Sequence, residues 1–337
     1  MTDGKGRLKA AWALVLLAPL CAEGALTGIS LPVIWLAFPL LIPIYGAGVL
    51  LVRELVTRAG AGWLGLLVMG LVYELAEDGL GLQALTSPNL YNAASWGRVL
   101  GVNVTYWESQ IGYHLVFSVL IPVAVTNLAF KRHAGRPYLK PFGLIVTAVV
   151  FVIGIALTRL AIAGTQDPTY QEPRSVTVTV LIAMIALGIL ALAVLPRLSL
   201  PRPAPFTRLP RPSTMGLVAG IAPIVFLGLI FPLRLGGHAD GPALGHGVWV
   251  VIPMLIALAV ALAVAWLVAR WSATDTFTDH HRTWLIGGAM VGHSLFAVVG
   301  GIAGGQVLLS PAIGAVVIAV TVLLLIRLDR LTRQPAQ

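Results

Sequence analysis

Long apolar runs separated by short polar segments make up most of this 337-residue chain. A helix needs roughly 20 mainly apolar residues to cross the hydrocarbon core of a bilayer. By that criterion the sequence predicts ten membrane-spanning helices, at residues 10–30, 31–52, 62–85, 109–130, 141–164, 176–196, 214–234, 247–270, 284–303 and 308–327. The pattern therefore predicts an all-α, polytopic integral membrane protein.

The composition excludes an ordinary soluble domain. Hydrophobic residues account for 58% of the chain and charged residues for only 10%, whereas soluble domains carry about 25% charged residues. The mean hydropathy of +0.91 agrees with this interpretation. The single cysteine, Cys21, lies in an apolar run and leaves no disulfide framework or cysteine-based metal site.

The basic residues predict the orientation of the spans. The net charge of +9 is distributed over the segments between spans and does not form the basic patch of a nucleic-acid-binding protein. With the N-terminus inside, eighteen Lys and Arg residues lie on the inner side and four on the outer side. Inner loops of membrane proteins are enriched in these residues. We therefore expect both termini in the cytoplasm of a multi-pass protein, most simply of a bacterial plasma membrane, with the first run retained as a helix.

Two connections between spans have unusual composition. Residues 197–213 are rich in proline and arginine, and proline prevents helix continuation. This segment predicts a cytoplasmic linker between an N-terminal part, 1–196, with six spans, and a C-terminal part, 214–337, with four. Residues 86–108 form the longest outer loop and are rich in aromatic residues, so the loop either lies on the membrane surface or folds back as a lid.

Acidic residues inside the predicted spans are the main functional signal. Carboxylates in hydrocarbon are costly and persist where they face a cavity, a partner or a reaction. The acidic residues inside the spans of this chain occur in spans one and three, and span four adds a histidine at similar depth. Spans one to four therefore carry the candidate site. The candidate catalytic residues are Glu23, Glu74, Glu77, Asp78 and His114. The acids of span three share one face at helical spacing, although Glu77 and Asp78 could instead pair locally at the helix end.

Several carboxylates in a low-dielectric site cannot all stay ionised, so at least one should hold its proton at neutral pH and act as a general acid. Aromatic faces nearby can stabilise a carbocation. Within spans one to four, which carry the candidate site, we single out Tyr45 and five predicted substrate-binding residues: Trp12, Trp35, Phe38, Tyr73 and Phe117. No metal or nucleotide motif is recognised, so no cofactor and no metal ligands are predicted. The loop with His238, Asp240 and His246 offers only a weak metal pattern.

The stretch from Glu74 to Leu85, followed by Asn89-Leu90-Tyr91, resembles little-characterised actinobacterial membrane proteins, and with them the bacterial integral-membrane terpene cyclases of the drimentine type. The resemblance covers spans one to four and rests on no diagnostic motif. It implies that Glu74, Glu77 or Asp78 protonates an alkene or epoxide of an isoprenoid. The others, or Glu23, would assist or take the final proton. The expected partners are a lipid-soluble small molecule and the bilayer, not nucleic acid.

Three alternatives stay open at this point. The order Glu77-Asp78, His114, His293 is similar to that of CAAX-processing intramembrane proteases. The match departs at Leu82 and Ala297, where that family has arginine and asparagine. Glu74 and His293 near the bilayer middle could instead relay protons or cations in a transporter. Finally, the acids could only hold helices together in a non-catalytic subunit.

Overall fold

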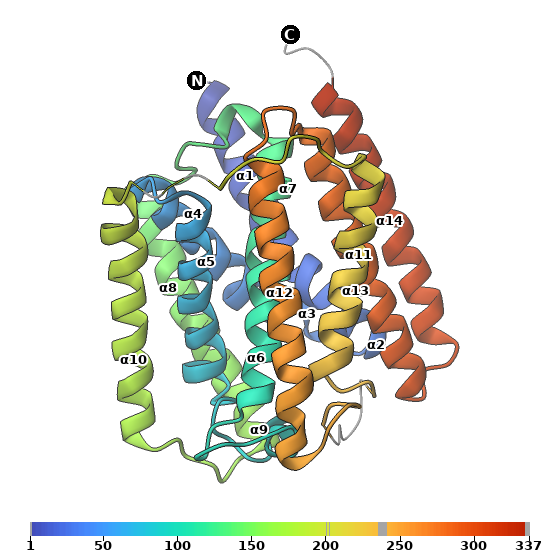
Figure 1. Ribbon diagram of the computed structural model, residues 1–337. Helices are drawn as coiled ribbons and strands as arrows, with labels where there is room; N and C mark the ends of the chain where they lie inside the picture. The colour runs from blue at the N-terminus through green and yellow to red at the C-terminus, as the bar shows by residue number, and fades with distance from the viewer. Residues whose placement is uncertain (1, 200, 202, 235–240, 334–337) are drawn as a thin grey trace. The chain divides into compact units, whose positions relative to one another are not determined.

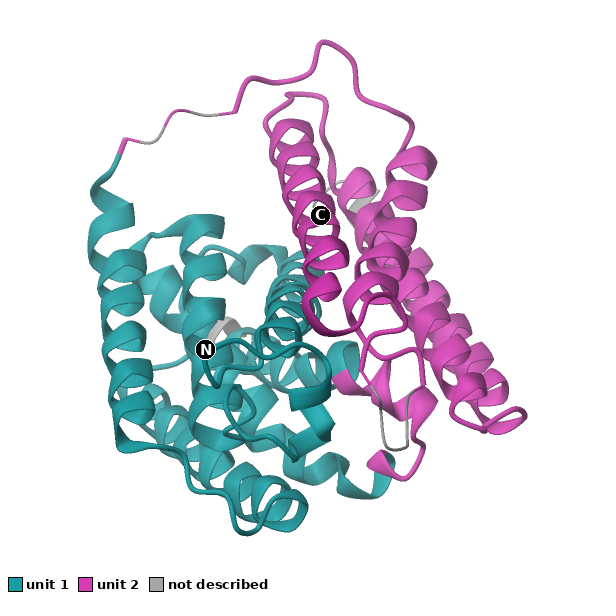
Figure 2. Ribbon diagram, turned by 60° about the horizontal axis from the view of Figure 1, so that its bottom comes forward, with its two compact units in different colours: residues 1–22, 35–198 teal, residues 23–34, 199–337 magenta. Residues whose placement is uncertain are grey.

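The computed structural model describes residues 2–199, 201, 203–234 and 241–333. Apart from one isolated bridge between Val99 and Val102, these residues form helices, turns and loops (Figure 1). The chain divides into two compact units, drawn in different colours in Figure 2. Unit 1 holds Met1–Ala22 and Trp35–Leu198, and unit 2 holds Glu23–Ile34 and Ser199–Gln337. The segment 23–34 therefore groups with the C-terminal part of the chain.

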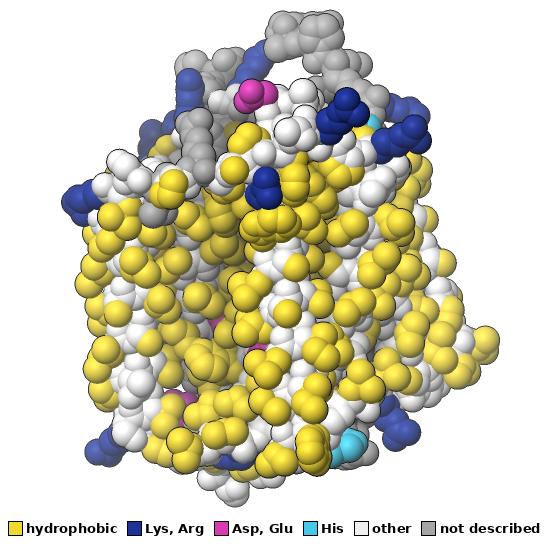
Figure 3. Space-filling model, in the orientation of Figure 1, with side chains coloured by type: hydrophobic (Ala, Val, Ile, Leu, Met, Phe, Trp, Pro, Cys, Tyr) yellow, Lys and Arg dark blue, Asp and Glu magenta, His cyan; other side chains and the backbone are white. Residues whose placement is uncertain are grey.

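Eight helices among the described residues are long and apolar enough to cross a membrane. They are Ile34–Ala59, Val104–Ala129, Pro141–Gln166, Arg174–Arg197, Pro212–Ile230, Gly247–Ser272, Asp279–Ala303 and Leu309–Leu331. Hydrophobic side chains cover the face shown in Figure 3, and Lys and Arg side chains lie toward the helix ends. The prediction of a polytopic helical membrane protein is confirmed.

The first and third predicted spans are helical but do not belong to these eight. The first runs from Thr2 to Gly24 and the third from Gly62 to Gly81. Every stretch of eighteen residues within either helix contains at least three Asp, Glu, Lys or Arg residues, which lowers its tendency to enter hydrocarbon. The residues after Gly24 form only the short helix α2 (Thr27–Ser30), so the first predicted span ends earlier than expected.

Unit 1 contains most of the short helical irregularities of the chain. Its α-helices are α1 (Thr2–Pro19), α3 (Ile34–Leu41), α4 (Gly48–Ala59), α5 (Gly62–Glu74), α6 (Val104–Tyr113), α7 (Ile121–Ala129), α8 (Pro141–Thr158), α9 (Gly164–Gln166) and α10 (Arg174–Ile189). Its π-helical turns are η1 (Leu20–Gly24, which ends in unit 2), η2 (Ile42–Ala47), η3 (Leu75–Gly81), η5 (His114–Leu120), η7 (Arg159–Ala163) and η8 (Leu190–Val194). Its 3₁₀ turns are η4 (Leu90–Ser95), η6 (Lys131–His133) and η9 (Leu195–Arg197).

Helix α5 and its continuation η3 occupy the interior of unit 1. Together they contact α4, α6, η5, α8, α10 and η8. Leu75, Leu85 and Val180 form part of the apolar packing around η3. Because neighbouring helices surround this segment, its acidic side chains are shielded from solvent although they lie near a helix end.

Unit 2 is held together by close contact between two helices. It contains α2, α11 (Pro212–Ile230), the 3₁₀ turn η10 (Gly247–Val250), α12 (Val251–Ser272), α13 (Asp279–Ala303) and α14 (Leu309–Arg333). Helix α11 packs on α12 and α13, and α2 packs on α13 and α14. Gly216 and Gly220 of α11 face Gly288 and Gly292 of α13 so closely that a Cβ atom at Gly292 would lie 1.9 Å from the Gly220 carbonyl oxygen. Small residues four apart allow such an approach of two helices in a membrane.

A buried ion pair within α4 is hydrogen-bonded to the connection between α7 and α8. Arg53 and Glu54 are 2% and 0% exposed, and Arg53 Nη1 lies 2.9 Å from Glu54 Oε1. The guanidinium of Arg53 also donates to the carbonyl oxygens of His133, Ala134 and Arg136. The pair is buried although it lies near the end of α4, because the connection folds over it.

The connection between η3 and α6 is ordered by buried polar contacts. Asp167 accepts hydrogen bonds from Ser87 Oγ, at 2.7 Å, and from the Asn89 side chain, at 3.2 Å. Asn103, which is fully buried, donates to the carbonyl oxygens of Ala84 and Ser87. The described non-glycine residues with positive φ, namely Gln83, Tyr91, Asn92 and Leu100, all lie in this connection. It is thus a folded structure tied to the α9 region rather than an extended surface loop.

Candidate functional site

The acidic residues of the third predicted span are buried together at the junction of α5 and η3. Glu74 is the last residue of α5, and Glu77 and Asp78 follow on the π-helical turn. The hydrogen bond from the Leu82 amide to the Glu77 carbonyl, at 2.8 Å, spans five residues and marks that turn. Glu74 and Asp78 are fully buried and Glu77 is 3% exposed. π-Helical turns occur frequently at functional sites.

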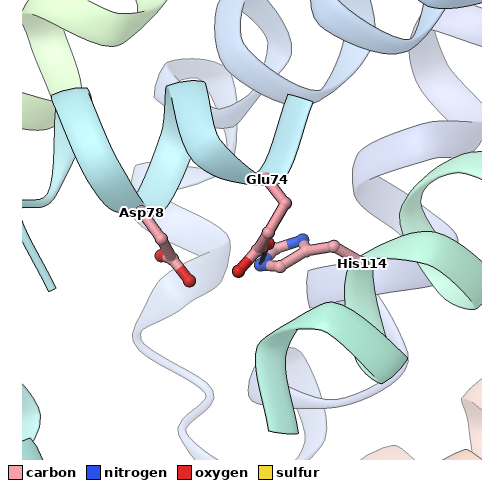
Figure 4. A group of neighbouring side chains, drawn as sticks. All are labelled: Glu74, Asp78 and His114. Atoms are coloured by element: carbon pink, nitrogen blue, oxygen red, sulfur yellow. Dashed lines mark ion pairs between the residues drawn. The ribbon is translucent and has the colours of Figure 1, made fainter. Parts of the chain in front are cut away.

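His114 reaches this acidic group from another helix. It begins the π-helical turn η5, directly after α6, and its imidazole lies between two of the carboxylates. Nε2 is 3.7 Å from Glu74 Oε2, and Nδ1 is 3.6 Å from Glu77 Oε2. Figure 4 shows Glu74 and Asp78 on one helix with His114 approaching from a second. We call Glu74, Glu77, Asp78 and His114 the acidic cluster. The structure thus brings together four of the five predicted catalytic residues.

Two further polar residues contact the acidic cluster. The Tyr106 hydroxyl donates to Asp78 Oδ1 at 3.2 Å, and Ser118 Oγ lies 2.9 Å from His114 Nδ1. The sequence interpretation did not select Tyr106 for the site. Its spacing would have found it, because residues 106, 110, 114 and 118 are each four apart and lie on one helix face.

Aromatic rings surround the imidazole of His114. The ring centroids of Tyr113, Tyr45 and Tyr73 lie 4.8 Å, 5.8 Å and 6.0 Å from that of His114. Phe117, which is buried, contacts the Tyr113 ring at 6.2 Å. Of the predicted substrate-binding residues, Tyr73 and Phe117 therefore lie at the acidic cluster.

The other three predicted substrate-binding residues lie elsewhere in unit 1. Trp12 is 66% exposed and Trp35 is 36% exposed. The Trp35 ring stacks on Phe38 at 5.3 Å. Trp12 and Trp35 were selected because they occur in spans one and two, within the region assigned to the site, but they turn to the surface. Their helices present one face to the interior and another to the surroundings, so membership of a span does not place a side chain in the site.

Two residues from the earlier hypotheses belong to unit 2. Glu23, predicted as catalytic, is half-buried in the segment 23–34, whereas the acidic cluster is built from unit 1 alone. His293, which the protease and transporter hypotheses use, is fully buried in α13. His238 and Asp240 lie outside the described residues.

The acidic cluster has the composition of a metal-binding group. Glu74, Asp78 and His114 each offer one ligand atom, and these atoms lie within 4.8 Å of one another. Both carboxylate oxygens of Glu74 are buried and have no hydrogen-bond partner among the described residues. A buried carboxylate in that position is stable only with a proton or a cation beside it. The cluster can therefore act chemically as a proton donor or as a set of metal ligands.

Comparisons with known proteins identify a family but no function. A search of curated proteins found no match, and neither did a search of solved structures. One family model matches residues 13–335, nearly the whole chain, and it is described as an uncharacterized membrane protein family. The chain belongs to that uncharacterized membrane protein family.

Proposed function

We propose that this protein is a membrane-embedded enzyme that uses the acidic cluster for electrophilic chemistry on a lipid-soluble substrate, of which an isoprenoid is the best candidate. One observation carries the proposal: Glu74 is fully buried, and neither of its oxygens has a hydrogen-bond partner among the described residues. A carboxyl group held only for structure would normally accept hydrogen bonds from the protein. The Glu74 oxygens accept none, so this carboxyl group can hold the proton that the proposed reaction uses.

The reaction that this arrangement favours is cyclisation started by a proton. A proton from the Glu74 position adds to an alkene carbon or an epoxide oxygen of the substrate. The electron pair of a neighbouring double bond then closes the ring. The positive charge that moves along the carbon chain is attracted by aromatic faces such as those of Tyr45, Tyr73 and Tyr113. A carboxylate of the cluster takes the final proton, so the product is an isomer of the substrate.

The membrane setting supports the choice of substrate. Helices that can cross a bilayer make up most of the chain, and the acidic cluster lies within unit 1, which contributes four of them. A polyprenyl chain is itself soluble in the bilayer and can reach such a site without crossing water. We place the protein in the plasma membrane of a bacterium with both termini in the cytoplasm, in agreement with the distribution of its basic residues.

Substitution of Glu74 tests this proposal. Membranes that contain the protein should convert a polyprenyl alkene or epoxide to a product of unchanged mass with one or more new rings. Glu74→Gln keeps the shape of the side chain but removes the acid, and we expect it to lower the rate by about 10²–10⁴-fold, the range for a lost general acid. Gas chromatography with mass spectrometry measures the product.

Glu108→Gln is the matched control, since Glu108 is a half-buried carboxyl on α6 outside the acidic cluster. It should retain the activity of the unmodified protein. Equal rates for Glu74→Gln and Glu108→Gln would contradict the assignment of the acid. Cleavage of a prenylated peptide, or proton-coupled uptake of a solute into vesicles, without any ring formation would replace the cyclase by the protease or the transporter.

A further inference from the structure

We propose that Glu74, Asp78 and His114 bind a divalent transition-metal ion. The three side chains come from two helical segments of unit 1, and each offers an atom within 4.8 Å of the other two. Ca²⁺ and Mg²⁺ prefer shells made of oxygen ligands, so a set of two carboxylate oxygens and one imidazole nitrogen does not suit them. Imidazole with carboxylate suits Zn²⁺, Mn²⁺ or Fe²⁺.

The environment of Glu74 gives independent support for a cation. The residue is 0% exposed, and both of its oxygens lack a hydrogen-bond partner in the described part of the chain. Asp78 and Glu77 bring further negative charge to the same buried region. The nearest positive candidate is His114, whose Nε2 is 3.7 Å from Glu74. A divalent ion would balance the carboxylates and satisfy the Glu74 oxygens at once.

The neighbours of His114 hold it in the orientation of a metal ligand. Its Nδ1 faces Ser118 Oγ at 2.9 Å and Glu77 Oε2 at 3.6 Å. If Nδ1 carries the proton, the lone pair of Nε2 points toward Glu74. Metal-bound histidines almost always donate their second ring N–H to a carboxylate or another acceptor, which fixes the tautomer and the ring orientation. Ser118, at hydrogen-bond distance from Nδ1, would therefore be the supporting residue. Glu77, at 3.6 Å, is too far from Nδ1 for a hydrogen bond and is not one of the three ligands.

Asp78 is supported in the same way. The Tyr106 hydroxyl donates to Asp78 Oδ1 at 3.2 Å, and Tyr106 is itself buried, with its ring 5.2 Å from that of Trp96. Carboxylate ligands are commonly held by such hydrogen bonds. Tyr106 acts on the ion only through Asp78 and is a positioning residue.

This inference rests on the proposed function for its substrate class and ring closure. In the metal-bound protein Glu74 would be a deprotonated ligand, so the ion would supply the electrophile in place of the Glu74 proton. Three protein ligands leave a coordination position open for substrate. Held by Glu74, Asp78 and His114, the ion would supply Lewis-acid activation of an epoxide oxygen. The C–O bond would break with its electron pair on oxygen while a double bond closes the ring. The proton lost from the final carbocation then protonates the oxygen, so the product is again an isomer.

Metal content provides a test that needs no substrate. The full-length protein is purified through a tag without histidine, reconstituted with Zn²⁺, Mn²⁺ or Fe²⁺ in turn, dialysed and measured by mass spectrometry of the elements. We expect about one equivalent of ion with at least one of these metals. Glu74→Gln, Asp78→Asn and His114→Gln should each retain less than about a tenth of it, and Glu108→Gln should retain it fully. Ser118→Ala and Tyr106→Phe should bind the ion about 10–100-fold more weakly.

Size-exclusion chromatography and thermal melts of each variant show whether it is folded. Metal content in folded Glu74→Gln equal to that of the unmodified protein would overturn the site, as would an unmodified protein that binds none of the three metals. Chelated protein that still forms rings at the full rate would overturn the role of the ion and leave the proposed function intact. A third outcome separates the two proposals. If the unmodified protein binds one equivalent of metal, the ligand variants lose it and no polyprenyl substrate is cyclised, the metal site is confirmed and the cyclase is overturned.

Discussion

Replacing Gly292 with alanine is expected to destabilise unit 2 by about 3 kcal/mol or more, because overpacking at a helix contact that cannot yield is among the costlier substitutions. The new Cβ atom would lie 1.9 Å from the Gly220 carbonyl oxygen, and a Cβ at Gly288 would lie 1.8 Å from that of Gly216. Both obstacles are backbone atoms, which cannot rotate away. Helices α11 and α13 would have to separate along their whole contact.

Unfolding in mixed micelles with increasing dodecyl sulfate, followed by circular dichroism, measures this effect. Gly228→Ala on α11 is the matched control, since nothing lies within 4 Å of its added Cβ. There alanine should leave stability unchanged or raise it by up to about 1 kcal/mol through its higher helix propensity. If Gly292→Ala unfolds at the same dodecyl sulfate fraction as Gly228→Ala, the close α11–α13 contact is wrong.

Replacing Arg53 with alanine is expected to destabilise unit 1 by about 3–5 kcal/mol, the cost of breaking a buried ion pair from one side. Glu54, which is fully buried, would lose its buried partner and keep only the half-buried Arg58 and the Tyr138 and Leu139 amides. The carbonyl oxygens of Ala134 and Arg136 would lose their guanidinium donor. The Tyr138 ring, 3.4 Å from the guanidinium carbon, would also lose its cation–π contact. The connection between α7 and α8 should therefore loosen.

The expected readouts are a lower unfolding midpoint and faster proteolysis between residues 131 and 140. Arg58→Ala is the control: it contacts the same carboxylate at 3.2 Å, but its side chain is 31% exposed, so it should cost at most about 1 kcal/mol. Arg53→Lys should fall between the two, because a lysine ammonium cannot reproduce the planar fork of guanidinium donors. Equal effects of Arg53→Ala and Arg58→Ala would show that the pair does not fix the connection.

Tyr106, which contacts the acidic cluster, shows what residue spacing along one helix can and cannot predict. Glu74 and Asp78 are four residues apart, so their position on one face follows from the sequence. Tyr106 and His114 are eight apart and share a face for the same reason, yet Tyr106 was attributed to a surface aromatic pattern. Its hydrogen bond to Asp78 depends on how α6 is rotated against η3, which no periodicity within α6 encodes.

The sequence by itself determined the class of protein and the region to search. Apolar runs and rare charges suffice for a polytopic helical membrane protein, because transfer into hydrocarbon depends on local composition. The acids of the third span indicated the candidate site for a similar reason. A carboxylate in an apolar span has a desolvation cost that can be recognised from the sequence alone. Most helix ends also followed from the runs, as in Pro141–Gln166 and Gly247–Ser272.

Only the tertiary structure decided which polar residues meet. It placed Glu23 in unit 2, turned Trp12 to the surface, and buried Arg53 under the connection that it holds. The π-helical turns at Glu77 and His114 shift the side chains by a fraction of a turn relative to a regular helix. Contacts between helices arise from packing among residues far apart in the chain, so the joining of His114 to the acids of η3 could be hypothesised from the sequence but settled only by the fold.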